Sequence, residues 1–174
     1  TPQGILALAK QYHYGLKDLL SQSGAAHFIV LERLQDPGNL GTILRAGEAA
    51  GITGVIMDSQ TADIYNPKGI RSTMGAVFRV PFVYVEDLKA ALLQLKDHGV
   101  HLYAAHLKGQ NSYDQEDYTE STGFLIGNEA QGLSDEIASL ADTYVKIPMA
   151  GSVESLNAAI ASSVLMFEVA RQRR

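Results

Sequence analysis

Residues 28–57 read FIVLERLQDPGNLGTILRAGEAAGITGVIM, and this stretch determines the class of fold. The apolar run 28–31 is typical of a buried strand, and the small-residue-rich segment 39–50 is typical of a helix. Gly51 suits the end of that helix, and a second apolar strand follows at 54–57. Strand, helix and strand in this order predict an α/β fold.

The same alternation continues along the chain. Apolar runs and cap residues predict further strands at 81–85, 101–105, 123–126 and 144–147. Helices are expected at 15–23, at 67–74 behind the cap Asn66, at 86–98, after the cap Ser134, and at 155–171. We therefore expect a mostly parallel sheet with helices on both faces. Ligands of such sheets bind beyond the carboxyl ends of the strands, which selects the loops after Leu31, Ala105, Ile126 and Ile147.

The composition excludes several classes of protein. The chain has 174 residues, of which 46% are hydrophobic and 19% charged, which is typical of one ordered globular domain. No apolar run approaches the roughly 20 residues of a membrane-spanning helix. The absence of cysteine excludes disulfides and thiolate metal sites, and agrees with a reducing compartment such as the cytoplasm.

The net charge of −5 argues against nucleic acid as a partner when taken as an average. Its distribution is uneven, because residues 32–79 are neutral while residues 86–136 carry −7. The neutral segment contains five basic side chains near the loop after the first strand: Arg33, Arg45, Lys68, Arg71 and Arg79.

The chain opens with TPQG and has no signal-like segment. We expect residues 1–14 to be a linker, or the end of a missing N-terminal segment, and residues 15–174 to form one catalytic domain.

Common phosphate-binding and hydrolase motifs are absent from the sequence, which has no G-x-G-x-x-G, no P-loop and no G-x-S-x-G. The five histidines lack metal-ligand spacing, so we expect no metal. Only His106 follows a strand at the binding edge, where a structural role is as plausible as a functional one.

The loop and helix at 36–47 carry the first candidate site. If Asn39 caps the helix, then Asn39, Thr42, Arg45 and Glu48 follow one polar line. Arg45 would then bind an anion such as phosphate. The alternative is an exposed arginine that pairs with Glu48.

Two further loops follow strands. In GNEAQGLS, 127–134, two glycines let the backbone fold tightly, and Glu129 is either a capping acid or a functional carboxylate. In IPMAGSVESLNAA, 147–159, Ser155 is the expected cap of the last helix, and Asn157 lies in its first turn. That helix carries two apolar stripes, of which one would cover the sheet and the other a partner subunit.

In their order and content, these three loops resemble those of the SpoU (TrmH-like) branch of the SPOUT RNA methyltransferases. The patterns that carry the resemblance are N-x-x-x-x-x-R, G-N-E-x-x-G-[LV]-S and I-P-M-x-G-x-x-x-S-L-N. The resemblance covers residues 29–174. It implies methyl transfer from S-adenosylmethionine to an RNA ribose 2′-hydroxyl, a deep C-terminal trefoil knot, and a homodimer. It is greatest to the type that modifies guanosine in 23S rRNA. A tRNA 2′-O-methyltransferase, a non-catalytic RNA- or cofactor-binding module, base methylation and a nucleotide-dependent α/β enzyme are the alternatives.

The resemblance also implies roles for individual residues. Arg45 matches the catalytic arginine, and the other expected catalytic residues are the polar motif positions Asn39, Glu129 and Asn157. The expected cofactor-binding residues are Ala105, His106, Leu107, Gly127, Asn128, Glu129, Gly132, Ile147, Met149, Ser155, Leu156 and Asn157.

Overall fold

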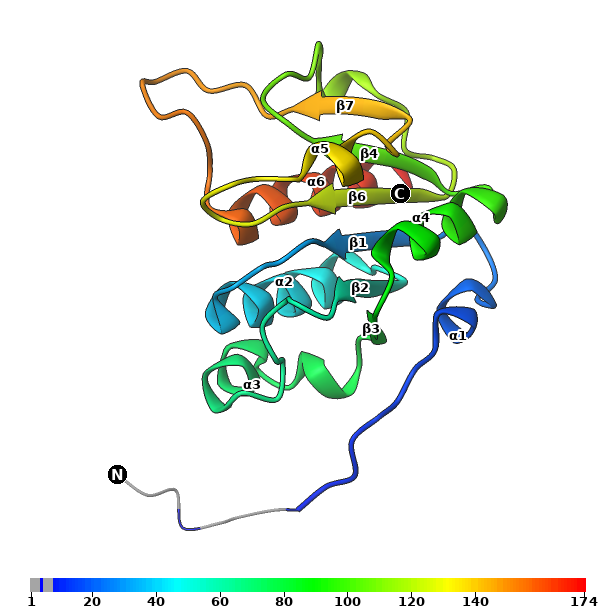
Figure 1. Cartoon of the computed structure of the whole chain (residues 1–174), viewed down its shortest axis with the longest axis vertical. Coiled ribbons are helices and arrows are strands. Elements are labelled where there is room, and N and C mark those ends of the chain that lie inside the picture. Colours follow the sequence, from blue (N-terminus) through cyan, green and yellow to red (C-terminus); the bar gives the residue numbers. More distant parts are fainter. Residues whose placement is uncertain (1–3, 5–7) are drawn as a thin grey trace.

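A single seven-stranded sheet, with every neighbouring pair of strands parallel, organises the computed structural model (Figure 1). It describes residue 4 and residues 8–174. The strands are β1 (His27–Leu31), β2 (Gly54–Asp58), β3 (Phe82–Val85), β4 (His101–Ala105), β5 (Asn111–Ser112), β6 (Thr122–Ile126) and β7 (Thr143–Lys146). The expected α/β class and parallel sheet are thus confirmed.

Helices cover both faces of the sheet, as expected. They are α1 (Leu16–Leu20), α2 (Pro37–Ala50), α3 (Pro67–Thr73), α4 (Leu88–Asp97), α5 (Asp135–Ala138) and α6 (Ala158–Gln172), with short 3₁₀ turns η1 (Ala76–Phe78) and η2 (Tyr113–Gln115). α2, η1 and α6 share one hydrophobic core with the sheet, and α1, α4 and α5 share the other.

The strand order is β3-β2-β1-β6-β4-β7-β5. The chain builds β1, β2 and β3 outward in one direction, then crosses to the other side of β1, where β6 inserts between β1 and β4. This reversal next to β1 makes β1, β6, β4 and β7 consecutive neighbours. Their carboxyl ends, and the loops selected from the sequence, therefore meet at one edge of the sheet.

A tight contact fixes α3 against α2. A Cβ atom on Gly41 would lie 1.9 Å from the Ser72 hydroxyl oxygen and 2.6 Å from the Gly69 carbonyl oxygen, so only glycine fits there. On its other side α2 packs against α6. α2 is therefore held between two helices, and its outer surface faces solvent.

Two of the expected helix caps are wrong. α2 is capped by Asp36, whose carboxylate accepts from the amides of Gly38 and Asn39, because Pro37 needs no amide partner at the first helical position. α6 is capped by Asn157 and not by Ser155, so the helix begins at Ala158. Both corrections change what the motif asparagines can do.

The remaining differences are small. The caps at Asn66 and Ser134 and the left-handed Gly51 after α2 are confirmed. α1 is shorter than expected, and the acidic loop after β4 contains the two-residue edge strand β5, which is too short to give a periodic signal. The remaining boundaries shift by one to three residues.

The segment before the first expected helix is only partly described. Residues 1–3 and 5–7 of the expected linker lie outside the described residues, and 8–14 contain no helix or strand. No helix in the described part of the chain is long and apolar enough to cross a membrane. The expected knot stays a prediction.

Candidate active site

The three motif loops meet at the carboxyl edge of the central strands. The loop after β1 leads into α2, the loop after β6 leads to α5, and the long loop 147–157 leads from β7 to α6 (left side of Figure 1). Neighbouring strands lie about 5 Å apart, so the loops leave the sheet close together.

The Glu129 carboxylate holds two of these loops together. Its Oε2 accepts from the Gln35 amide at 3.0 Å, and its Oε1 accepts from the Asp36 amide at 3.0 Å and from Asn39 Nδ2 at 3.1 Å. Burial raises the pKa of this carboxyl, but these hydrogen bonds outweigh that effect and leave the pKa lowered. Glu129 thus acts across the two loops and caps no helix.

Asn39 extends this contact to the third loop. Its Oδ1 accepts from Asn157 Nδ2 at 3.0 Å, while Asn157 Oδ1 caps α6 by accepting from the Ala159 and Ile160 amides. Because Asp36 caps α2, the Asn39 side chain is free to make both contacts. One hydrogen-bond network therefore joins the three motifs through Glu129, Asn39 and Asn157.

The loop after β6 is closed on itself. Asn128 and Gly132 exchange backbone hydrogen bonds at 3.1 and 2.9 Å, and Asn128 Oδ1 accepts from the Ala130 and Gln131 amides. A Cβ atom on Gly127 would lie 2.1 Å from the backbone of Gly132, so no side chain fits at that position. Gly127 is required by the closure of the loop itself.

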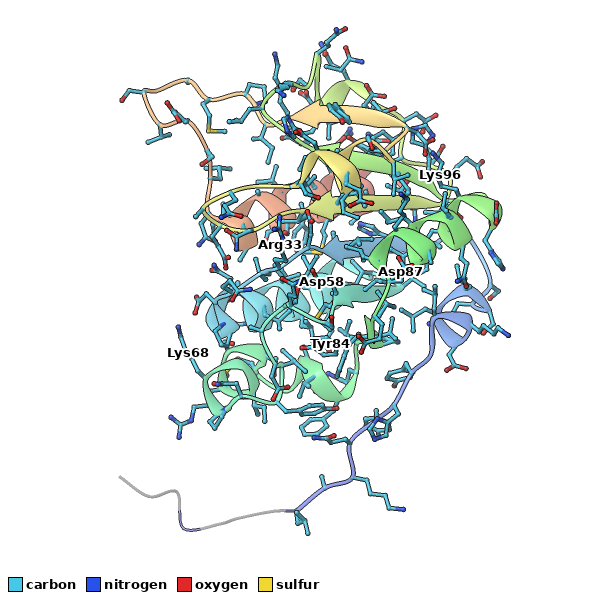
Figure 2. The ribbon with its side chains drawn as sticks, viewed as in Figure 1. Arg33, Asp58, Lys68, Tyr84, Asp87 and Lys96 are labelled. Carbon is cyan, nitrogen blue, oxygen red and sulfur yellow. The ribbon has the colours of Figure 1, made fainter. Side chains whose placement is uncertain are left out.

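Sequence reasoning missed two residues that support this edge. The Arg33 backbone is left-handed, with φ 52°, and Arg33 lies near Asp58 (Figure 2). The Arg33 amide donates to Asp58 Oδ1, and Asn128 Nδ2 donates to the Arg33 carbonyl. Buried Glu32 accepts from the Ser134 amide at 2.7 Å. An arginine in a conformation that favours glycine gives no sequence signal, whereas a charged residue at a strand end could have indicated Glu32.

Arg45 lies on the exposed face of α2, about 9 Å along the helix axis from Asn39. It forms no hydrogen bond or ion pair within the described residues. The pairing with Glu48 considered from the sequence does not occur, because both carboxylate oxygens of Glu48 bind Arg79. The Arg45 guanidinium is therefore open to an external anion.

The residues expected to bind a cofactor line the same edge. Ala105 and Ile147 pack on the core below it, while Leu107 is 68% exposed. His106 is tied into a turn: its amide donates to the Val145 carbonyl, and its Nδ1 accepts from the Lys108 amide. Met149 and Leu156 are half-buried in the long loop, where Ser155 is exposed.

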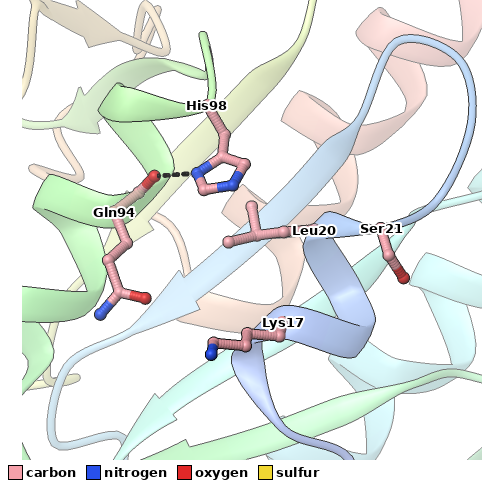
Figure 3. Close-up of a pocket in the computed structure, with 5 residues that line it drawn as sticks. All are labelled: Lys17, Leu20, Ser21, Gln94 and His98. Carbon is pink, nitrogen blue, oxygen red and sulfur yellow. Dashed lines mark hydrogen bonds between the residues drawn. The ribbon is translucent and has the colours of Figure 1, made fainter.

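A separate pocket lies at the other edge of the sheet. Lys17, Leu20, Ser21, Gln94 and His98 line it, between α1 and the end of α4 (Figure 3). None of these residues belongs to the three motif loops. Among the described residues no group of three histidine, cysteine, aspartate or glutamate side chains could hold a metal ion.

Comparison with protein families matches residues 26–167 to the SpoU rRNA methylase family. The chain belongs to this family. A Staphylococcus aureus (strain MSSA476) protein, assigned by name to the TrmH family of tRNA/rRNA methyltransferases, is 35% identical over 98% of this chain and 71% of its own.

Solved structures of RNA methyltransferases have the same fold. The AdoMet-bound rRNA methyltransferase of Sinorhizobium meliloti is 36% identical, with a TM-score of 0.85 over 93% of this chain and 62% of its own. A structure described as an RNA 2′-O ribose methyltransferase is 29% identical, with a TM-score of 0.79 over 99% of this chain and 62% of its own. The chain thus spans about three fifths of these two proteins.

We predict that Glu129→Gln lowers the free energy of unfolding by about 1 kcal/mol at pH 7. The substitution replaces one acceptor oxygen with an amide nitrogen, which would face an N–H donor and could not accept its hydrogen bond. The folded-state pKa is lowered, so the stabilisation is present above the unfolded pKa and disappears as pH falls through the folded value. Urea denaturation between pH 7 and 3 measures both effects.

The control is Glu154→Gln, since Glu154 is exposed and forms no hydrogen bond within the described residues. Its stability should equal that of the wild type. The role of Glu129 would be contradicted if wild type and Glu129→Gln had the same free energy of unfolding at pH 7, or if the difference between them grew as pH falls.

Proposed function

We propose that this chain transfers a methyl group from S-adenosylmethionine to a ribose 2′-hydroxyl of RNA, with 23S rRNA as the preferred substrate. The observation that carries the proposal is the hydrogen-bond network of Glu129, Asn39 and Asn157 at the carboxyl edge of the sheet. Arg45, which has no partner among the described residues, lies on the same helix as Asn39. The substrates also lead us to propose a cytoplasmic location.

The loops have the chemistry that S-adenosylmethionine requires. Apolar side chains at the edge, among them Ala105, Leu107 and Ile147, suit the adenine ring and the carbon atoms next to the sulfonium sulfur. Val153 in the long loop is a further exposed apolar side chain, with 62% of its surface accessible. Gly127 and its tightly closed loop would present backbone amides and carbonyls to the polar atoms of adenine. The AdoMet-bound relative supports the same choice of cofactor.

S-adenosylmethionine supplies an electrophilic methyl group on sulfur. Transfer of this methyl group to the ribose oxygen would release the sulfur as a thioether, and the hydroxyl proton would pass to water. A ribose hydroxyl is a weak nucleophile, so it must be held in line with the methyl group. An arginine guanidinium stays protonated in proteins, and we therefore assign Arg45 to anchor an RNA phosphate and to stabilise the developing alkoxide. Proton removal by a phosphate-assisted Arg45 is the alternative.

The choice of rRNA over tRNA rests on the family's description as rRNA methylases and on the relative that is named an rRNA methyltransferase. The staphylococcal relative is named for both RNAs, so tRNA is the second candidate. Basic side chains around the first motif, including Lys68 and Arg71, would contact the RNA backbone.

The function is tested by incubating the chain with S-adenosylmethionine labelled in its methyl group and with 23S rRNA or tRNA transcribed in vitro. A 2′-O-methyl group blocks alkaline cleavage of the adjacent phosphodiester, so the label should appear in alkali-resistant dinucleotides. Label in mononucleotides would indicate base methylation, and binding of cofactor without transfer to either RNA would indicate a non-catalytic module.

Arg45→Ala should lower the transfer rate at least tenfold, a loss of about 1.4 kcal/mol or more in transition-state stabilisation. Affinity for S-adenosylmethionine, measured by calorimetry, should stay near that of the wild type, because Arg45 lies outside the cofactor loops. A variant that keeps more than about a tenth of the rate would show that Arg45 has no catalytic role.

We also propose that the chain forms a homodimer through α6. Leu165, Met166 and Val169 face the core, whereas Ile160 and Phe167 are 51% and 44% exposed on the other stripe. A second copy of the chain would cover these exposed apolar side chains.

The double substitution Ile160→Glu/Phe167→Glu should convert a dimer into a monomer in light scattering after gel filtration, because two charges would be buried in the interface. Leu93→Glu is the control, since Leu93 is 47% exposed on α4, which packs on the opposite face of the sheet. A monomeric wild type, or a dimer that survives the double substitution, would contradict the proposed interface.

A further inference from the structure

α2 carries two charged side chains, Arg45 and Glu48, which lie three residues apart. Side chains at this spacing lie next to each other on a helix and can form an ion pair. In this protein they do not. Glu48 Oε2 accepts from Arg79 Nη2 at 2.9 Å, and Glu48 Oε1 accepts from Arg79 Nε. Both oxygens of the one acidic group on α2 are thus occupied by a residue from another element.

The local backbone places Arg79 for this contact. η1 packs against α2, and Arg79 follows η1 directly. Gly75, with φ 90°, lies beneath the guanidinium, since a Cβ atom there would be 3.1 Å from Arg79 Nη1. The missing side chain of Gly75 leaves room for Arg79 to reach across to Glu48. The ion pair between Arg79 and Glu48 is therefore one of the contacts through which this turn packs on α2.

We propose that Arg79 is a positioning residue that binds Glu48 and so prevents Glu48 from pairing with Arg45. Arg45 then keeps its guanidinium available for RNA. This inference rests on the proposed function, in which Arg45 is the residue that meets the substrate.

Loss of Arg79 releases Glu48 toward Arg45, one turn away. An exposed pair of this kind is weak, so Arg79→Ala should lower kcat by about two- to fivefold at saturating RNA. Glu48→Gln alone should leave kcat unchanged, because Glu48 is already occupied. In the Arg79→Ala background the same substitution should restore kcat. Non-additivity of this kind would show that Arg79 affects kcat through Glu48.

The rates are measured with the labelled cofactor and with whichever of the 23S rRNA and tRNA transcripts accepts the methyl group. Arg71→Ala is the matched control, because it removes the same charge from α3, and Arg71 makes no contact with Glu48 within the described residues. Any effect of Arg71→Ala should not be relieved by Glu48→Gln. Calorimetric affinity for S-adenosylmethionine checks that each variant is folded.

Three results would overturn the proposal: an unchanged kcat in Arg79→Ala, a loss that Glu48→Gln does not relieve, or an equal gain from Glu48→Gln in the wild type. The last would indicate a general charge effect on RNA binding. The Arg45→Ala variant, measured in parallel, separates failure of the proposed function from failure of the proposed role of Arg79. If it is active, the proposed role of Arg45 fails; if it is inactive while Arg79→Ala is normal, only the role of Arg79 fails.

Discussion

The carboxylate of Glu129 is the contact on which the arrangement of the motif loops depends. It accepts from two backbone amides of the loop after β1 and from the side chain of Asn39, and through Asn39 it reaches the cap of α6. Each of these hydrogen bonds joins residues 90 or more positions apart in the chain, beyond the ends of the paired strands β1 and β6. A charged acceptor is suited to this task, because hydrogen bonds to a carboxylate are stronger than those between neutral groups.

The same contact explains why α2 can serve a reaction. With its cap supplied by Asp36 and its first turn tied to Glu129, the helix has a fixed start, and its packing against α3 and α6 fixes its sides. Arg45 then projects from a rigid element toward solvent, and Glu48 is held by Arg79. A rigid support is what a group needs in order to hold a phosphate at a constant distance from a reacting hydroxyl.

Local features of the fold could be predicted from the sequence, and non-local ones could not. The apolar run 28–31, the glycine at 51 and the cap Asn66 each act over a few residues, and the structure confirms them. The insertion of β6 beside β1 depends on pairing between strands far apart in sequence, for which periodicity gives no signal. The motif pattern indicated a functional role for Asn39 but not its hydrogen-bond partners, Glu129 and Asn157. Asn39 can contact both of them because Asp36, and not Asn39, caps α2.

The central claim is that the loops after β4, β6 and β7 hold S-adenosylmethionine beside Arg45. The most direct test is a crystal structure of this chain with bound S-adenosylmethionine. We expect the cofactor between these loops, with its methyl group on the side of α2 that bears Arg45. Cofactor in the pocket of Lys17 and His98, or with its methyl group turned away from Arg45, would contradict the account.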